Sequence, residues 1–221
     1  TITATVTVDQ VTVNGTLSLN SGSTINFPSN VLSKLVVGSA GVLNVSGTIN
    51  QAGIGGNNKI ITVNGIENLL DNGSHTGSSS TKNFFTNGST FNYDCTTTTG
   101  TIPTADWATG STCVIRGITT GGAPVGLNQT FYNFTWDLSS LNLGDYLYLD
   151  GEPSIINGNY RILNTNTSVT SSGLALLNAT GTKTITVGGN FEVAGDTYLA
   201  KNLHNLYIYC ISGFFILFFV I

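Results

Sequence analysis

Apolar and small polar residues alternate along most of the chain, in short runs. The run at residues 11–27, VTVNGTLSLNSGSTINF, keeps its apolar residues mostly at odd positions and is interrupted at Asn-Gly and Ser-Gly-Ser. Such alternation predicts half-buried β-strands, and the small polar residues predict the turns between them. Similar runs return at residues 35–50, 60–66 and 184–193. The sequence therefore predicts many short strands.

The spacing of these runs favours a β-solenoid. Small polar pairs with glycine recur as Asn-Gly at 14–15, Ser-Gly at 46–47 and Asn-Gly at 64–65, at intervals that suit one or two coils. Hairpins are the alternative, because Asn-Gly between alternating runs also favours a tight antiparallel turn. We predict an all-β fold, a single-stranded parallel β-helix with degenerate coils of about 16–20 residues.

The end of the chain differs from the rest. We predict one solenoid over residues 1–196 and a separate hydrophobic tail over 197–221, because residues 206–221 carry no charge and are mostly apolar. As a helix they would span about 24 Å, short of the roughly 30 Å hydrocarbon core of a bilayer. A truncated membrane anchor, a capping element and a reading-frame artefact remain alternative interpretations. The chain contains no Met and begins at Thr1, so we expect a fragment or a processed product.

The composition narrows the functional classes. Charged residues make up 8% of the chain, against roughly 25% in ordinary soluble domains. The polarity comes instead from Ser, Thr, Asn and 27 Gly residues, and the net charge is −4. Nucleic-acid binding needs a basic stripe that neutralises phosphates, and the seven Lys and Arg residues are scattered singly. We therefore expect no nucleic-acid partner, no cofactor, and contact with a membrane only if the tail is natural.

Two cysteines are candidates for a disulfide. The interval between Cys95 and Cys113 is one coil of the predicted length. Neighbouring coils stack about 4.8 Å apart, a spacing close to the Cα separation that a disulfide accepts. The alternative is two separate thiols. No Cys-x-x-Cys motif occurs and only two His residues are present, so a metal site is not expected.

The remaining candidate residues give weak indications of chemistry. Asp150 and Glu152 are an acidic pair of the kind that sugar-bond cleavage uses, but Asp-Gly and Glu-Pro indicate a turn first. Trp107 and Trp136 could stack on sugar rings, although tryptophans of β folds usually pack in the core. Threonine arrays such as TITATVTV can match ice, yet the similar runs place Val, Leu or Ser where Thr would have to repeat. We therefore expect no ice-binding face and no catalytic residue.

One segment is similar to a known class of proteins. Residues 100–119, GTIPTADWATGSTCVIRGIT, and residues 126–137, GLNQTFYNFTWD, resemble phrases of large secreted surface proteins of Bacteroidetes-type bacteria. The resemblance implies a β-helical, adhesin-like stalk exported by the type IX secretion route to the outer cell surface. Surface glycans or other cell-surface proteins would be its partners, and the resemblance transfers no functional residues.

From these observations we expect a structural or adhesive segment of an exported bacterial surface protein, without catalysis. The alternative is a carbohydrate-active or carbohydrate-binding β-helix, similar to polysaccharide lyases or hydrolases. Two carboxylates in one cleft, about 5–10 Å apart, would favour the alternative. A phage-type fibre module is a third interpretation and would require a trimer.

Overall fold

The structure is a computed structural model that describes residues 1–28, 34–52, 60–97, 100–142, 145–149, 151–165, 173–175, 183–194, 206–210 and 216–219. Every regular element in these residues is a β-strand, and the strands pair mainly in parallel as stacked coils. The predicted β-solenoid is confirmed. Two compact units make up the chain: Thr1–Cys95 with Thr99–Thr112, and Thr96–Thr98 with Cys113–Ile221. This division falls within the predicted solenoid of residues 1–196.

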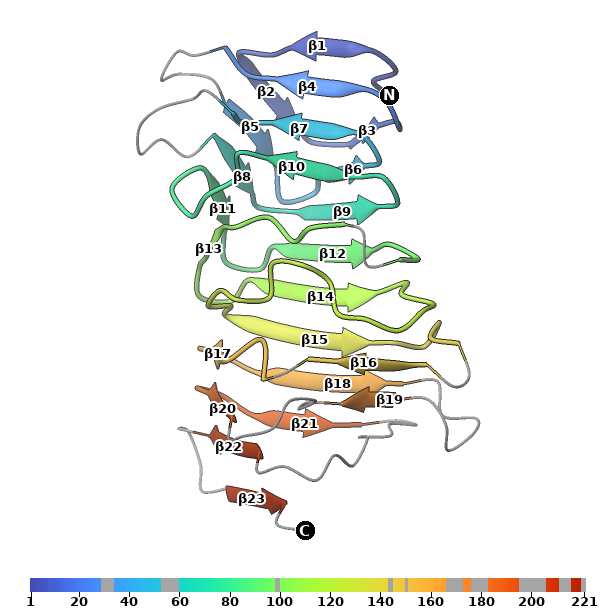
Figure 1. The fold of residues 1–221 in the computed structure, drawn as a ribbon. Coiled ribbons are helices and arrows are strands. Elements are labelled where there is room, and N and C mark those ends of the chain that lie inside the picture. The colour runs from blue at the N-terminus through green and yellow to red at the C-terminus, as the bar shows by residue number, and fades with distance from the viewer. Residues whose placement is uncertain are drawn as a thin grey trace. The chain divides into compact units, whose positions relative to one another are not determined.

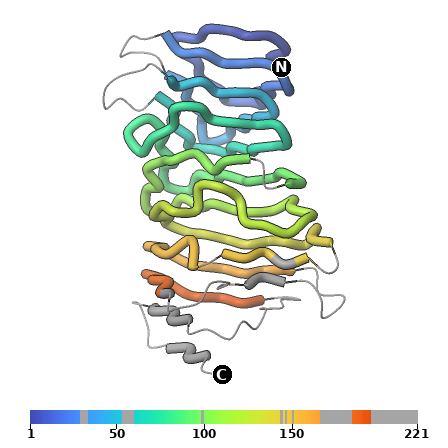
Figure 2. Tube along the Cα trace, viewed as in Figure 1, coloured from blue at the N-terminus to red at the C-terminus, as the bar shows by residue number. Residues whose placement is uncertain are grey.

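The first unit has three parallel sheets, so each full coil contributes one strand to each sheet (Figure 1). Figure 2 follows the backbone of this unit from coil to coil. The first sheet contains β1 (Thr5–Thr7), β4 (Thr24–Asn26), β7 (Thr48–Asn50) and β10 (Ser74–Thr76). The second contains β2 (Gln10–Val13), β5 (Lys34–Val37), β8 (Ile61–Val63), β11 (Asn83–Phe85) and β13 (Asp106–Trp107). The third sheet contributes β3 (Thr16–Leu19), β6 (Val42–Val45), β9 (Ile66–Leu70) and β12 (Thr90–Asp94).

The coils of this unit are longer than the sequence predicted. Ser18 and Asn44, which are partners in neighbouring coils, are 26 residues apart, and Asn44 and Asn68 are 24 residues apart. A shorter step of 22 residues separates Asn64 from Thr86, which directly follow β8 and β11. Three strands and three corners account for this length, although each strand has only two to five residues.

The predicted period was wrong because it compared different corners of the coil. Gly15 lies at the corner before β3, where its carbonyl accepts a hydrogen bond from Val42 N. Gly47 lies at the corner before β7, and its carbonyl accepts from Ser74 N. The corner equivalent to Gly15 in the next coil is Gly41, whose carbonyl accepts from Ile66 N. The two corners resemble each other in sequence but not in position.

Side chains of the same kind stack inside the first unit. In the second sheet Val13, Val37, Val63, Phe85 and Trp107 occupy successive inward positions of one register. All five are buried. The Phe85 and Trp107 rings are nearly parallel, with centroids 4.3 Å apart. Because inward positions recur at every second residue, the alternating sequence builds a continuous apolar core.

One corner requires glycine because two coils approach closely there. A Cβ atom on Gly41 would collide with the carbonyl oxygen of Val13 in the preceding coil. A Cβ atom on Gly15, at the equivalent corner one coil earlier, would meet nothing within 4 Å. Backbone crowding, and not a positive φ angle, therefore sets the requirement for glycine at residue 41.

The second unit is also built mainly from parallel strands, in less regular coils. One set of neighbouring strands comprises β14 (Thr112–Arg116), β15 (Asn133–Asp137), β18 (Tyr160–Asn164) and β21 (Phe191–Val193). A second comprises β17 (Ile155–Ile156), β20 (Lys183–Val187), β22 (Leu206–Cys210) and β23 (Ile216–Phe219), and a third β16 (Tyr146–Tyr148) and β19 (Gly173–Ala175). Asn133 and Asn159, at equivalent places in two coils, are 26 residues apart, and Asn159 and Asn190 are 31 residues apart.

Aromatic side chains form the core of the second unit. Phe131, Phe134, Trp136 and Tyr160 are fully buried. The Trp136 indole nitrogen donates a hydrogen bond of 2.9 Å to the Tyr160 hydroxyl oxygen. Burial raises the pKa of Tyr160 well above its usual range, although the Trp136 bond acts in the opposite direction. The buried hydroxyl therefore stays protonated and is held by one defined partner.

The described residues of the predicted tail are strands. β22 pairs in parallel with β20, and β23 pairs antiparallel with β22. Among the residues that the structure describes, no helix reaches the length and hydrophobicity needed to cross a membrane. The predicted boundary near residue 196 lies outside the described residues, and the origin of the tail stays a prediction.

Candidate functional site

A ladder of amide side chains runs along the outer face of the third sheet in the first unit. Asn68 Nδ2 donates to Asn44 Oδ1 at 2.8 Å, and Asn92 Nδ2 donates to Asn68 Oδ1 at 2.8 Å. Ser18 extends the ladder by accepting a 3.3 Å bond from Asn44 Nδ2. An Asn amide has two N–H donors and one carbonyl acceptor. The half-buried Asn44 and Asn68 therefore each keep one N–H for a ligand.

The outer face of the first sheet carries two rows of polar side chains. These eight residues, which we call the threonine face, are Thr5, Thr24, Thr48 and Ser74 in one row and Thr7, Asn26, Asn50 and Thr76 in the other. The Thr48 and Ser74 hydroxyl oxygens are 3.1 Å apart. Asn50 Nδ2 donates to Asn26 Oδ1 at 2.9 Å, and the Thr76 hydroxyl donates to Asn50 Oδ1 at 3.1 Å.

The threonine face and the amide ladder consist of uncharged residues, although Asp94 lies two residues after Asn92 on the same strand. No Asp, Glu, Lys or Arg occupies any of the eight positions of the threonine face or the four positions of the amide ladder. An outward ion pair does occur in the second unit, where Arg161 Nε lies 2.7 Å from Glu192 Oε2 on paired strands. The hydrogen bond between them raises the pKa of Arg161 and lowers that of Glu192. The threonine face and the amide ladder therefore suit neutral ligands that form hydrogen bonds.

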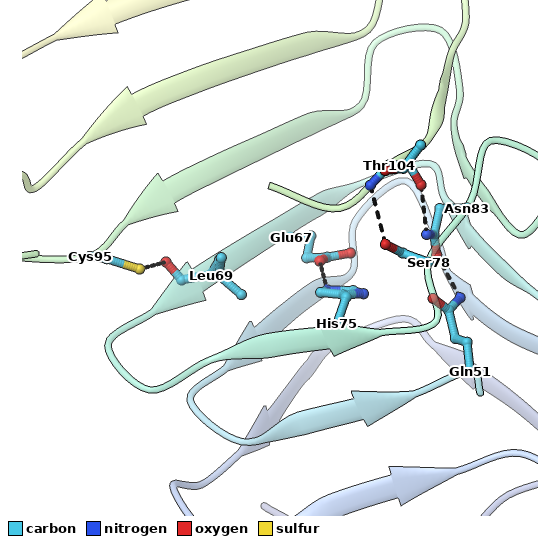
Figure 3. A network of polar contacts seen from close by, with 8 residues as sticks. All are labelled: Gln51, Glu67, Leu69, His75, Ser78, Asn83, Cys95 and Thr104. Atoms are coloured by element: carbon cyan, nitrogen blue, oxygen red, sulfur yellow. Dashed lines mark hydrogen bonds and ion pairs between the residues drawn. The ribbon is translucent and has the colours of Figure 1, made fainter. Parts of the chain in front are cut away.

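A buried acid–histidine pair interrupts the apolar core of the first unit (Figure 3). Glu67 of β9 lies in the inward register position between Leu43 and Phe91, and His75 of β10 lies next to Ile49. Their side chains are almost completely buried, and His75 Nε2 is 2.7 Å from Glu67 Oε1. Glu67 Oε2 and His75 Nδ1 have no hydrogen-bond partner among the described residues.

This pair has the geometry of a carboxylate that orients a general base. Catalysis would also require access for a substrate, and the side chains of Glu67 and His75 are only 0% and 1% exposed. Each replaces an apolar residue of its ladder, so each needs a polar partner inside the coil. The role of the pair is therefore structural: each side chain provides the other with a hydrogen-bond partner inside this coil.

A second buried polar group lies close by in the same unit (Figure 3). Gln51 Nε2 donates to Asn83 Oδ1 at 2.6 Å, and Asn83 Nδ2 donates to the carbonyl of Thr104 at 2.9 Å. The backbone N–H of Thr104 donates to Ser78 Oγ at 3.3 Å. Gln51 and Asn83 are both buried. These bonds connect three successive coils through side chains.

The two tryptophans considered as candidates for sugar contact lie in the core. Trp107 is 6% exposed, with one ring face against Phe85, and Trp136 is completely buried against Phe134. Neither indole is exposed for a sugar to stack on. The alternative of core packing describes both residues.

The two cysteines considered as candidates for a disulfide are free, buried thiols. Cys95 follows the end of β12, whereas Cys113 is the second residue of β14. They therefore do not hold equivalent positions on their strands, which the predicted bridge assumed. Cys95 Sγ donates to the Leu69 carbonyl at 3.4 Å (Figure 3). Burial raises the pKa of Cys95 to about 12, with a further contribution from Asp71, and burial also raises that of Cys113.

Of the candidate acidic pair Asp150 and Glu152, the structure describes only Glu152. Glu152 Oε2 accepts a 3.0 Å hydrogen bond from the backbone N–H of Ser154, and Glu152 N donates to the Leu149 carbonyl. These bonds hold a turn, as the composition of this segment indicated. Asp150 lies outside the described residues.

Sequence reasoning missed the buried pair of Glu67 and His75, because recognising the pair requires the strand register. In the observed register Glu67 aligns with Leu43 and Leu17, and His75 aligns with Ile49 and Ile25. A polar residue in a column of apolar ones is the signal that would have found both. The shorter period predicted from the sequence hides that column.

Neither a search for metal sites nor comparison with known proteins assigns a function to this chain. Among the described residues, no three His, Cys, Asp or Glu side chains are grouped so as to hold a metal ion. The chain matches no protein-family model, no curated protein and no solved structure. Its function must therefore be inferred from its own surfaces.

Proposed function

We propose that this chain is a structural and adhesive segment of an exported bacterial surface protein, without catalysis of its own. The observation that carries the proposal is the amide ladder Ser18–Asn44–Asn68–Asn92 along outward positions of the third sheet, in which Asn92 is the one buried member. Neutral hydrogen-bonding groups thus recur on successive coils. Such a surface can hold a long partner at many equivalent points.

The architecture suits a segment of a stalk. Each coil bonds only to its neighbours, so a solenoid can lengthen without a new core design. A single contact between a neutral amide and a hydroxyl is weak, roughly 0.5–1.5 kcal/mol. Repetition along the axis turns such contacts into polyvalent binding. Surface glycans and other cell-surface proteins are the partners that this chemistry favours.

The exported setting rests on the resemblance of residues 100–119 and 126–137 to Bacteroidetes-type surface proteins. These segments contain Trp107, Phe131, Phe134 and Trp136, which are core residues. In this chain the residues that carry the resemblance therefore include core residues, as a shared stalk architecture would require. Type IX secretion is part of the proposal because the same resemblance implies it.

Localisation on intact cells of the source organism tests the proposal. We expect antibodies against the chain to label unpermeabilised cells, and external protease to remove that label. Labelling only after permeabilisation would contradict export. Sustained release of reducing ends from polysaccharides by the purified chain would contradict the absence of catalysis.

Adhesion needs a separate measurement with matched variants. Beads coated with the purified chain should bind to intact cells or to immobilised neutral glycans, and Asn68→Leu should weaken binding because it removes the central rung. Thr62→Leu, an outward substitution in the second sheet, is the control. Equal binding by the two variants would show that the amide ladder is not the adhesive surface.

A further inference from the structure

The threonine face is a two-row array. The registers of β1, β4, β7 and β10 place a hydroxyl at each of four successive positions in one row, and a hydroxyl or an amide at each of four in the other. From the sequence we expected no repeated threonine positions, because the runs that were compared lie on different sheets. In the observed register, Thr24, Thr48 and Ser74 do superimpose.

The array has two regular spacings. Neighbouring strands of a sheet lie about 4.7–4.9 Å apart, and residues i and i+2 of one strand are separated by about 6.4–6.8 Å. The spacing between strands is close to a repeat between water oxygens on crystal faces of ice, and the spacing along a strand is somewhat shorter than the second repeat. Hydroxyl and amide groups on such a lattice can hold a layer of water in positions that ice continues.

The array is also rigid. Thr48 bonds to Ser74, Asn50 to Asn26, and Thr76 to Asn50, all within 3.1 Å. Threonine is branched at Cβ and has few χ1 rotamers. Beneath the face, Ile25 and Ile49 are 1% and 0% exposed. Hydrogen-bonding groups held in this way lose little conformational entropy when they meet an ordered surface.

Charge and shape select the ligand. The eight side chains are short and uncharged, so the face offers no ion pair to a charged polymer and no large side chain to a protein partner. Thr5, Thr7 and Thr76 are exposed, and the other five residues are half-buried. The threonine methyl groups add small apolar patches between the polar groups. A flat, neutral crystal of water is complementary to such a surface.

We propose that the threonine face binds ice. The water oxygens of the crystal surface accept and donate hydrogen bonds at the two rows, and the threonine methyl groups lie between them. No covalent step is involved. This inference goes beyond the proposed adhesive role and does not depend on export.

Ice adsorption by the purified 221-residue chain tests the inference. We expect the chain to be retained on a growing ice hemisphere and to produce faceted crystals with a gap between the melting and freezing temperatures. Thr48→Tyr inserts a bulky ring in the middle of one row and should abolish both effects. Thr62→Tyr, which makes the same change on the outer face of β8, should leave them unchanged.

The remaining outcomes are also decisive. If the unaltered chain does not adsorb to ice, or if Thr48→Tyr and Thr62→Tyr behave alike, the inference is overturned. Thr24→Val, a smaller change, should weaken adsorption and serves in place of Thr48→Tyr if the tyrosine variant does not fold by circular dichroism. A chain found on the cell surface that ignores ice would refute this inference and leave the proposed function standing.

Discussion

Replacing the buried acid–histidine pair by apolar residues should stabilise the first unit. Glu67 lies between Leu43 and Phe91 in its ladder, and His75 lies next to Ile49. The double substitution Glu67→Leu and His75→Ile would extend both apolar columns through this coil. The two new side chains match the residues one coil earlier, so they require little adjustment of the backbone.

The expected change in the free energy of unfolding follows from the cost of burying the polar pair and from the stabilisation that apolar side chains contribute in its place. Replacing a buried ion pair by apolar residues of similar volume is neutral or stabilises by about 1–4 kcal/mol. Glu67 Oε2 and His75 Nδ1 are both buried without a partner among the described residues, and each such group costs about 1–3 kcal/mol. We therefore expect a gain of about 1–4 kcal/mol in the free energy of unfolding for the double variant.

The single variants should behave in the opposite way. His75→Ile leaves the Glu67 carboxyl group alone in the core, which should cost about 3–5 kcal/mol. Glu67→Leu leaves the imidazole without its 2.7 Å partner, which should cost about 1–3 kcal/mol. The double variant should therefore be more stable than either single variant and than the unaltered chain. This reversal is the signature of a coupled buried pair.

Guanidinium denaturation followed by far-UV circular dichroism measures these differences, provided that the slope stays constant among the variants. Ile49→Val is the control for a general perturbation of this ladder and should cost about 0.5–1.5 kcal/mol. A double variant less stable than the unaltered chain would refute the reasoning. So would a His75→Ile variant that costs no more than Ile49→Val.

Three further substitutions or measurements test the packing. Gly41→Ala should destabilise by about 1–3 kcal/mol because its Cβ has no room, whereas Gly15→Ala at the equivalent corner should change the free energy of unfolding by less than about 1 kcal/mol; chemical denaturation compares them, and equal effects would contradict the close approach. Tyr160→Phe leaves a buried indole N–H unpaired and should cost about 1–3 kcal/mol. The same change at Tyr148, which is 45% exposed, should shift the melting temperature little, and a larger shift there would argue against the buried bond. Cys95 should react with a thiol reagent at pH 8 only after unfolding, because burial raises its pKa from 9.0 to about 12. Because the pKa of Cys95 is higher in the folded than in the unfolded chain, the thiol's contribution to stability is complete below pH 9.0 and is lost as the pH rises toward 12. Rapid labelling of Cys95 in the native chain would contradict this burial.

The sequence was sufficient to predict the strands and their parallel stacking, but not the length of the coil. Alternation is a local property, so the strand around Val11 and Val13 could be read directly. The register is not local, because the residues that pair lie a whole coil of three strands apart along the chain. Corners of different sheets use the same small residues, and Gly15 and Gly47 could not be told apart by composition.

The polar features depended on that register and were lost with it. Glu67 and His75 lie on different sheets and meet only because both strands face the same interior. Trp107 and Trp136 were uncertain for a simpler reason. An indole has a polar edge and an apolar body, so its composition alone does not decide between the surface and the core.

The register also explains why so few residues of this chain are charged. In a parallel solenoid each outward residue faces its counterpart in the next coil at about 4.8 Å, and like charges placed directly opposite destabilise a sheet. Asparagine and threonine avoid this conflict, because each is both donor and acceptor and can pair with a copy of itself, as Asn44, Asn68 and Asn92 do. Where Arg161 and Glu192 occupy paired positions, their charges are opposite. The low charge of the surface is therefore a consequence of how the coil repeats.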